Sequence, residues 1–423
     1  MSRIVMLVEP AEGHFNACVP IISKLVERQH QVICITGRGF KQRVESLGIQ
    51  FHPLPTQWDP AEQEIYEFFS ELKQLKGLAQ IKYYLKHIMF DQVPDVIAVL
   101  NEVLESFKAD VIICDTFMIA GNWMTELKGI PSVRLSVLPL SLPYKEFAPF
   151  GLGLPPADSF LSKLKNNALN MMFEKVLFKD VQSHCNAIRE QVGLPHYDKS
   201  FFVKGYEIPN LVLHVSIPQF EYPRPYFPDN FRFIGAVLNA PQVNYQWPDW
   251  WSSLDKNRPT VLINQGTVAK NHQDLIAASI QALKNEALNI IILPVKQGDI
   301  LDLPSNVFTA DYIPFGNLLP YIDVMVTNGG FGGTQQALAH GIPLVVAGAT
   351  EDKMEVAARV DYAKVGINLK QQQPSAESIK TAVLTVLSAT EYKQAANALK
   401  SAYAEYDAAV LAVKYIEALI EPI

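Results

Sequence analysis

Residues 323–352, DVMVTNGGFGGTQQALAHGIPLVVAGATED, decide the fold of this 423-residue chain. The apolar run 324–326 predicts a buried strand, 334–340 a helix and 343–347 a second strand. The turn before the helix holds Gly329, Gly330, Gly332 and Gly333. Glycines leave room for a ligand, and the N–H groups at the helix start point at it. The stretch predicts a β-turn-α-β unit that binds an anion, with phosphate expected; close packing is the other reason for such glycines.

Two acidic residues follow the second strand and suggest what the anion belongs to. Glu351 and Asp352 open the next predicted helix, where carboxylates can hold the hydroxyl groups of a sugar. A phosphate site followed by a hydroxyl site suggests a nucleotide sugar. A dinucleotide is the rival ligand, because Gly330-x-Gly332 with an acid about 20 residues later imitates the dinucleotide-binding fingerprint. The imitation fails in detail, since Gln335 replaces the third glycine and the acids open a helix instead of closing a strand.

This stretch resembles a known family. TNGGFGGTQQALAHGIP at 327–343 is similar to the T-H-G-G-x-G-S-T-x-E-A-L-x-x-G-x-P pattern of nucleotide-sugar-dependent glycosyltransferases with the GT-B fold, the UDP-glycosyltransferase family that includes antibiotic, macrolide and plant enzymes. The T-N-G-G and T-E-D-K variants look like a bacterial branch. The resemblance implies an α/β fold of two Rossmann-like domains facing a cleft, with a C-terminal helix that returns to the first domain. It covers nearly the full length, is strongest over 260–370 and is weakest over 55–230.

Length and composition support two domains, whose roles are those that the resemblance implies. The length suits two domains of about 200 residues, and 49% hydrophobic residues allow large cores. The clearest boundary is the Pro-, Asn- and Trp-rich segment 239–258, read as a linker between an acceptor-binding domain at 1–238 and a nucleotide-sugar-binding domain at 259–405. Residues 406–423 are expected to form the returning helix. The partners expected are a nucleotide sugar and a hydrophobic small molecule, in a monomer or a homodimer.

Charge, cysteines and hydropathy bear on other partners and on location. A net charge of −7 with no basic cluster makes nucleic acid a poor partner. The cysteines at 18, 34, 114 and 185 form no C-x-x-C pair, so reduced core thiols in a cytoplasmic protein are expected. No stretch reaches the roughly 20 apolar residues of a membrane helix, and the N-terminus lacks the features of a signal peptide.

A histidine and an aspartate are the expected catalytic pair. Residues 3–10 predict a buried strand, and Gly13 and His14 follow in an expected exposed turn at its carboxyl edge, before a helix capped by Asn16. Asp115 ends the apolar strand 111–115 at the same edge, where a helix cap is the alternative role. A carboxylate that orients one imidazole nitrogen makes the other nitrogen a better base. Together the two positions match the family's G-H-x-N turn and strand-end aspartate, which implies a general base and its orienter.

The resemblance also implies which residues meet the nucleotide and the donor sugar. Gly266 and Thr267 match a turn that meets the β-phosphate, and Tyr312, with Ile313 after it, stands where an aromatic ring stacks on the base. The glycine turn adds the remaining nucleotide positions, which are Asn328, Gly329, Gly330, Gly332, Gly333, Thr334 and Gln336. The donor-sugar positions are Glu351, Asp352 and Lys353.

Several of these positions depart from the family pattern. Asn328 replaces the histidine expected on the α-phosphate, Gly333 a serine, Gln336 the ribose-binding glutamate and Lys353 the glutamine of D-Q. All except Gly333 keep a side chain that can hydrogen bond. The donor class is therefore clearer than the donor itself: UDP-glucose is expected, and a dTDP- or UDP-deoxysugar stays open.

An acceptor site is expected from two segments, one between His14 and Asp115 and one after Asp115. Residues 62–107 are predicted to be mostly helical, and their aromatic residues exceed the needs of one packed face, although ordinary core is the competing interpretation. Residues 138–156 are rich in proline and cannot form a helix or a central strand. In the family, loops at these two places form the acceptor mouth. The residues expected there are Phe68, Tyr84, Phe90, Tyr144 and Phe147.

The expected reaction is an inverting transfer of a sugar to a hydroxyl of a phenolic or polyketide-like acceptor. His14 would take the hydroxyl proton, and helix-end amides would stabilise the leaving diphosphate. The scheme needs no metal and no cofactor, and the sequence has no D-x-D motif to bind one. A non-hydrolysing nucleotide-sugar epimerase, a catalytically silent nucleotide-sugar-binding protein and an NAD-dependent oxidoreductase remain as other classes.

Overall fold

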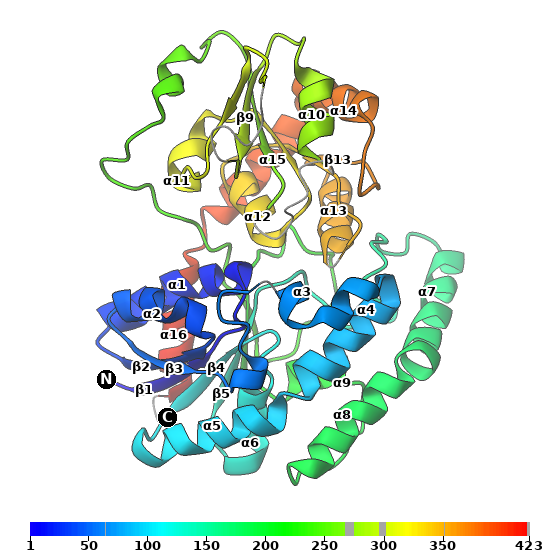
Figure 1. The fold of residues 1–423 in the computed structure, drawn as a ribbon. Coiled ribbons are helices and arrows are strands. Elements are labelled where there is room, and N and C mark those ends of the chain that lie inside the picture. The colour runs from blue at the N-terminus through cyan, green and yellow to red at the C-terminus, as the bar shows by residue number, and fades with distance from the viewer. Residues whose placement is uncertain (64, 267–274, 296–301, 351, 421–423) are drawn as a thin grey trace.

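The structure, a computed structural model, describes residues 1–63, 65–266, 275–295, 302–350 and 352–420. It contains two parallel sheets, one in each half of the chain, as Figure 1 shows. The first sheet has seven strands in the order β3-β2-β1-β4-β5-β6-β7. Their bounds are β1 (Arg3–Leu7), β2 (Gln31–Thr36), β3 (Gln50–Pro53), β4 (Val111–Asp115), β5 (Ser132–Ser136), β6 (Leu211–His214) and β7 (Phe231–Phe233).

The second sheet repeats this plan. It has six strands in the order β10-β9-β8-β11-β12-β13. Their bounds are β8 (Thr260–Asn264), β9 (Asn289–Leu293), β10 (Val307–Thr309), β11 (Val324–Thr327), β12 (Leu344–Val346) and β13 (Gly366–Asn368). The α/β fold expected from the sequence, with a sheet of parallel strands in each half, is confirmed.

Each sheet has a point where the strand order reverses, and both expected sites lie there. β1 pairs with β2 on one side and with β4 on the other, and β8 pairs with β9 and with β11 in the same way. In open parallel sheets the crevice at the carboxyl end of such a reversal is where ligands bind. His14 and Asp115 follow β1 and end β4, whereas Gly266 and Asn328 follow β8 and β11.

Helices cover both faces of the first sheet. α1 (Glu12–Glu27) and α16 (Ala408–Ile420) share one buried apolar cluster with the sheet, and α5 (Val93–Ser106), α6 (Ala120–Lys128) and α8 (Lys179–Gln191) contribute to the cluster on the other face. The other helices of this half are α2 (Lys41–Ser46), α3 (Ile65–Phe68), α4 (Gly77–Tyr83), α7 (Phe160–Met172) and α9 (Phe201–Glu207), with π-helical turns η4 (Tyr84–Phe90) and η5 (Phe173–Leu177) and 3₁₀ turns η1 (Arg38–Phe40), η2 (Thr56–Trp58) and η3 (Ser70–Gln74).

The second sheet is also sandwiched between helices. α10 (Ile276–Leu283) and α14 (Ala376–Ser388) cover one face, and α12 (Phe331–Ala339), α13 (Lys353–Tyr362) and α15 (Thr390–Tyr403) the other. α11 (Phe315–Leu318) and the 3₁₀ turns η6 (Asp249–Ser253) and η7 (Leu319–Tyr321) complete this half. After α15 the chain crosses back, so that α16 packs on α1 and both termini lie in the lower half of Figure 1. The expected return of the C-terminal helix is confirmed. Among the described residues no helix is long and apolar enough to cross a membrane.

A buried ionic network joins the two halves. Arg359 on α13 donates its Nε to Glu221 in the first half at 2.7 Å and an Nη to the carbonyl of Leu140 at 3.2 Å. Glu355, one turn earlier, accepts the backbone N–H groups of Gly151 and Gly153 at 2.8 and 2.9 Å. The proline-rich segment 138–156, which forms neither helix nor strand as expected, is thereby tied to the second half.

Two local expectations differ from the structure. Gly13 and His14 are not in an exposed turn, because α1 already begins at Glu12, and its N-cap position is Ala11 instead of Asn16. α12 begins at Phe331, so Gly332 and Gly333 lie within its first turn. A helix can start before its periodic apolar pattern, since the first turn needs no buried side chain.

Candidate active site

Asp115 is held by three hydrogen bonds in the first half of the candidate site. Its side chain has no exposed surface, and it stands at the end of β4 beside β1. The His14 Nδ1 donates to its Oδ2 at 2.8 Å, the backbone N–H of Glu9 donates to the same oxygen at 3.0 Å, and the N–H of Phe117 donates to Oδ1 at 3.0 Å. These bonds hold the carboxylate in one orientation. The bond to Nδ1 leaves Nε2 as the nitrogen of His14 that can accept a proton.

His14 sits in the first turn of α1 with 13% of its side chain exposed. Burial by itself would lower the pKa of His14, but the Asp115 carboxylate, the hydrogen bond to it, and the charges of Glu9 and Asp352 raise the pKa to about 9. At neutral pH the resting imidazole therefore carries a proton. Asp352 belongs to the other half of the chain, and its carboxylate is one of the charges that raise the pKa of His14.

Glu9 is a site residue that the sequence analysis missed. It is buried two residues after β1, and its Oε1 accepts the hydroxyl of Tyr84 at 2.9 Å. Burial and the nearby Asp115 carboxylate raise its pKa to about 7, against the opposing effects of His14 and Tyr84. The signal was present, because Glu9 is an acid at the end of an apolar strand, which is the pattern that singled out Asp115.

Aromatic rings border the catalytic pair. The ring of Phe117 lies 5.3 Å from that of His14 and 5.1 Å from that of Tyr84. Phe117 was also missed, and it follows the strand-end aspartate in sequence. Tyr84, an expected acceptor residue, therefore lies next to Glu9 and Phe117, which both neighbour the pair of His14 and Asp115.

The other expected acceptor residues lie elsewhere. Phe90 is 1% exposed and packs edge-on against Phe201, so the structure places it in the core and it does not line an acceptor surface. Phe68 is partly exposed and contacts the neighbouring Phe69. Tyr144 and Phe147 line a depression with Leu142, Phe150 and Phe173, and His14 is not among the described residues that line it.

The N-terminus of α12 forms the second half of the site. Gly329 has a φ of +86°, and a Cβ there would come within 2.8 Å of Val346, so only glycine suits this turn. Gly330 is the N-cap residue, and the space where a Cβ of Gly332 would stand is open to 4 Å. The first N–H groups of α12 have no partner within the helix, so this open end can receive an anion.

Two buried polar atoms beside this helix end lack a hydrogen-bond partner among the described residues. They are Oδ1 of Asn328 and Oγ1 of Thr334. The amide group of Asn328 is held from its other side, where Nδ2 donates to the carbonyl of Gln265 at the end of β8. Because unpaired buried polar atoms are costly, these two atoms mark positions where a polar ligand would be stabilised.

The remaining nucleotide positions divide as follows. Gly266 has a φ of +81° and lies against Asn328, whereas Thr267 lies outside the described residues. Tyr312 is 63% exposed and its ring can stack, but Ile313 is buried and can offer only its backbone. Gln336 accepts the backbone N–H of Asn239 in the linker at 3.4 Å.

Of the donor-sugar positions, Asp352 and Lys353 are described and Glu351 is not. Asp352 precedes α13, as expected, and is half-buried. Lys353 is buried, and its Nζ donates to Thr350 at 3.4 Å. The carboxylate of Asp352 and the ammonium group of Lys353 thus belong to the segment that follows β12, next to the helix end of α12.

Comparison with known families identifies the class of protein. Residues 4–113 match the sequence profile described as "Glycosyltransferase family 28 N-terminal domain", and residues 275–418 match "Erythromycin biosynthesis protein CIII-like, C-terminal domain". The calicheamicin glycosyltransferase CalG4 has the same fold, with a TM-score of 0.76 over 99% of this chain and 98% of that chain at 20% identity. The fold is GT-B, and the protein is a glycosyltransferase.

Two relatives make the assignment more specific. The chain is 36% identical to 4'-demethylrebeccamycin synthase from Lentzea aerocolonigenes over 99% of its own length and 100% of that protein. It is 32% identical to UDP-glycosyltransferase 2 from Phaeomoniella chlamydospora over 96% of its length and 93% of the relative. The chain belongs to the UDP-glycosyltransferase family of GT-B enzymes, in the branch of the antibiotic and macrolide glycosyltransferases.

Proposed function

We propose that this enzyme transfers glucose from UDP-glucose, with inversion, to a hydroxyl group of a hydrophobic small molecule such as a phenolic or a polyketide. The observation that carries the proposal is the buried hydrogen bond between His14 and Asp115, together with the effect of the Asp352 charge on His14. A base on one half of the chain and a sugar-binding carboxylate on the other would enclose the anomeric carbon.

In this mechanism Nε2 of His14 takes the proton of the acceptor hydroxyl as the acceptor oxygen bonds to the anomeric carbon. The bond from that carbon to the diphosphate oxygen breaks on the opposite face, and the electron pair leaves with UDP. Asp115 accepts the hydrogen bond of Nδ1 throughout and stabilises the imidazolium that forms. Only the neutral imidazole can act, and with a pKa of about 9 it is about 1% of the enzyme at pH 7.

The leaving diphosphate would meet the N-terminus of α12. Oriented N–H groups stabilise developing charge without needing to reorganise. Asn328 could turn its amide toward the α-phosphate, and the backbone of Gly332 and Gly333 would bind the β-phosphate with the hydroxyl of Thr334. We propose that the helix end supplies this stabilisation in place of a metal ion.

The donor and the acceptor are supported by separate observations. The name of the Phaeomoniella relative supports a UDP-sugar, and Asp352 supplies a carboxylate for its hydroxyl groups. The names 4'-demethylrebeccamycin synthase and calicheamicin glycosyltransferase support a natural-product acceptor. A dTDP-deoxysugar is the competing donor.

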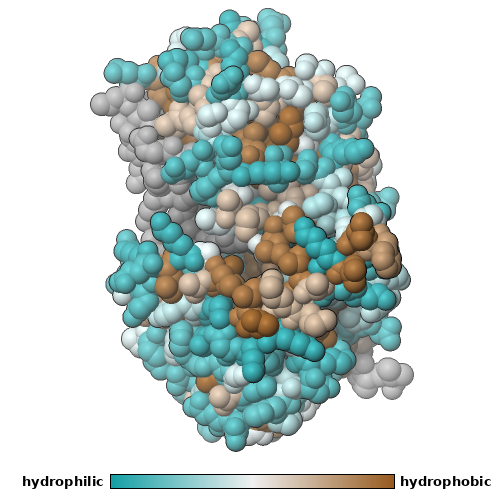
Figure 2. All heavy atoms as spheres, turned by 90° about the vertical axis from the view of Figure 1, so that its right-hand side faces the viewer, coloured by the Kyte–Doolittle hydropathy of each residue, from teal (hydrophilic) through white to brown (hydrophobic). Residues whose placement is uncertain are grey.

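An exposed apolar surface on the first half suits a hydrophobic acceptor. In the view of Figure 2 apolar side chains gather in a band at mid-height, bordered by hydrophilic residues. The exposed apolar residues of α7 and η5, which belong to this side of the molecule, are Phe160, Leu161, Leu164, Met171, Met172 and Val176. Exposed apolar surfaces of this kind often mark places where apolar molecules bind.

A mass-spectrometric screen tests the proposal. UDP-glucose, dTDP-sugars and other sugar nucleotides are incubated with mixed phenolic, polyketide and lipid alcohols, and with no acceptor. A hexose added to an acceptor, with UDP released, supports the proposal. Isomerised sugar nucleotide without acceptor would instead identify an epimerase, and UDP-glucose binding with no turnover of any donor would identify a binding protein. The cytoplasmic location expected from the cysteines stays a prediction, to which their burial as free thiols is suited.

A further inference from the structure

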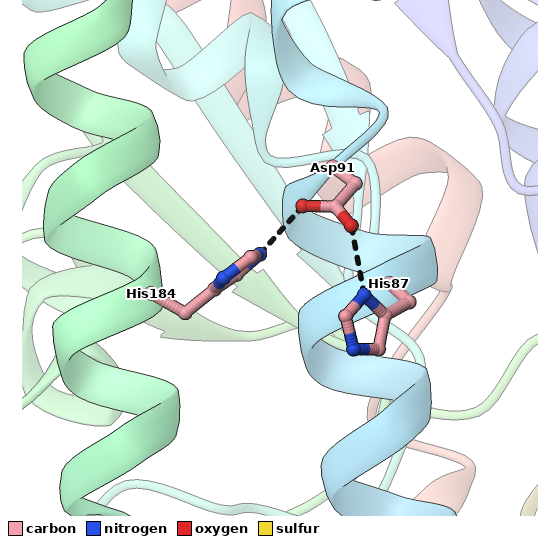
Figure 3. A group of neighbouring side chains, drawn as sticks. All are labelled: His87, Asp91 and His184. Atoms are coloured by element: carbon pink, nitrogen blue, oxygen red, sulfur yellow. Dashed lines mark hydrogen bonds and ion pairs between the residues drawn. The ribbon is translucent and has the colours of Figure 1, made fainter.

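A second group of chemistry-bearing side chains lies where η4 contacts α8, outside the site described above. His87 is on η4, Asp91 caps its C-terminal end, and His184 is on α8, as Figure 3 shows. The carboxylate of Asp91 lies between the two rings. Its Oδ2 accepts from Nδ1 of His87 at 2.9 Å, and its Oδ1 accepts from Nε2 of His184 at 2.5 Å.

These side chains have the composition and spacing of a metal site. One ligand atom from each of the three lies within 4.8 Å of the other two. Two imidazoles and one carboxylate match three-ligand zinc sites, which complete a tetrahedron with water. We propose that His87, Asp91 and His184 bind one Zn²⁺ ion that joins η4 to α8.

The change from the hydrogen-bonded arrangement to the metal-bound one is small. Zinc bonds of about 2.0–2.2 Å require ligand atoms to lie about 3.4 Å apart in a tetrahedron. Because no two ligand atoms lie more than 4.8 Å apart, they have to close by at most about 1.4 Å, which side-chain rotation can supply because the three side chains are 25–42% exposed. Each neutral imidazole would move its proton to the far ring nitrogen, where water can accept it, so that the near nitrogen binds the ion.

The backbone favours this clustering. The N–H of Asp91 bonds to the carbonyl of Lys86, five residues earlier, in the wide turn of a π-helix. With about 4.4 residues in a π-helical turn, His87 and Asp91 lie nearly on one face. Such turns are often found at functional sites. The ring of Tyr83 packs 4.9 Å from that of His87.

The nearby lysines are paired with a different carboxylate. Lys82 and Lys86 on the same helix reach Asp180 on α8, at 2.6 and 3.6 Å. Asp180 stands one turn before His184, so it draws these positive charges away from the proposed ion. Among the described residues, the Asp91 carboxylate forms its ion pairs with His87 and His184.

The ion would act at a distance from the reacting atoms. Tyr84 lies three residues before His87 and contacts both Glu9 and Phe117 beside His14. Fixing η4 to α8 would therefore restrain Tyr84. The proposed zinc is a positioning element and takes no part in the transfer chemistry.

Zinc binding to the full-length, untagged protein tests this proposal. The protein is stripped with a chelator, and titration with ZnCl₂ alone is followed by calorimetry and by elemental analysis after dialysis. We expect the wild type to bind one Zn²⁺ per chain. His184→Gln should lower the affinity for zinc at least about 100-fold, since even a change outside the direct ligands typically costs about 10–100-fold. His196→Gln is the matched control, because His196 is 60% exposed on the following loop, pairs with Glu190 at 3.5 Å, and should leave binding unchanged.

Two further measurements keep the proposal falsifiable if His184→Gln does not fold. His87→Gln changes the most exposed ligand and should give the same loss. Amide hydrogen exchange of the wild type should slow in residues 84–91 and in α8 when zinc is added. A wild type that binds no zinc, or His184→Gln and His87→Gln variants that bind it as the wild type does, would show that the cluster is only a hydrogen-bonded clamp between helices.

Discussion

Removal of the proposed base should affect transfer in a manner that depends on pH. His14→Ala deletes the imidazole that Asp115 orients at 2.8 Å. General-base catalysis typically contributes about 100- to 10,000-fold in rate. We therefore expect His14→Ala to lose at least about 100-fold in kcat/KM for an aliphatic alcohol at high pH, while its affinity for UDP stays near that of the wild type.

The pH profile of the wild type follows from the charges around His14. Because its pKa is raised to about 9, kcat/KM should rise about tenfold per unit above pH 7 and level off near pH 9, a total gain of about 100-fold. The carboxylate of Glu9 contributes to this raised pKa. Glu9→Gln should consequently move the midpoint to lower pH and raise the rate at pH 7.

The assay uses UDP release with the best aliphatic alcohol of the acceptor screen and with a phenol of similar shape. A phenol ionises more easily and should partly rescue His14→Ala. Asp115→Asn should lose less than His14→Ala, because an amide oxygen still orients the ring but lacks the charge. If His14→Ala kept more than about half of the wild-type rate on the alcohol at pH 9, another residue would be the base, and a wild-type profile that is level from pH 7 would contradict the charge argument.

The other predictions concern the donor side and the contact between the two halves. Gly332→Asp should weaken UDP binding in calorimetry by charge repulsion without loss of folding, because the site is open and a carboxylate suits a helix N-terminus; unchanged affinity would place the diphosphate elsewhere. Asp352→Ala should reduce discrimination among UDP-sugars, because the sugar loses a hydrogen-bond partner worth about 1–3 kcal/mol of binding free energy, while free UDP binds as before. Equal losses of affinity for UDP and for the UDP-sugar would contradict this role. Arg359→Met should cost about 3–5 kcal/mol in chemical denaturation because it removes the guanidinium partner of the buried Glu221 and leaves only His214, whereas Arg28→Met on the surface should cost under about 1 kcal/mol. Burial by itself would raise the pKa of Glu221, but Arg359 and His214 together lower this pKa to about 2. The ionised Glu221 therefore stabilises the folded state above its ordinary pKa of 4.5, and this stabilisation should be lost as pH falls from 4.5 toward 2. A free energy of unfolding that stays constant over that window would refute this prediction.

Local sequence patterns were sufficient for most of the elements. The expected strand 111–115 agrees with β4 residue for residue, because an apolar run bounded by polar residues is a local signal. Element ends were less certain where no side chain is buried, as at the start of α1, where His14 proved to be helical. Phe90 could not be separated from an acceptor residue, since a buried aromatic residue and a ligand-lining one look alike in sequence.

The sequence by itself determined the glycosyltransferase class through the resemblance of residues 327–343 to a known family, and it placed His14 after the first strand, Asp115 at the end of another strand, and the glycine turn before α12. The strands and the turn follow from residue type and short spacing, which local sterics and hydrogen bonding convert directly into backbone geometry. The tertiary structure alone brought Glu9 and Phe117 to the catalytic pair and carried the charge of Asp352 to His14. It likewise assembled His87 and Asp91 with His184 from a helix 93 residues away, and Arg359 with Glu221 from the other half of the chain, 138 residues apart. The reason is physical: the energy of a charge or a hydrogen bond depends on distance and burial in space, and the packing of the whole chain decides both.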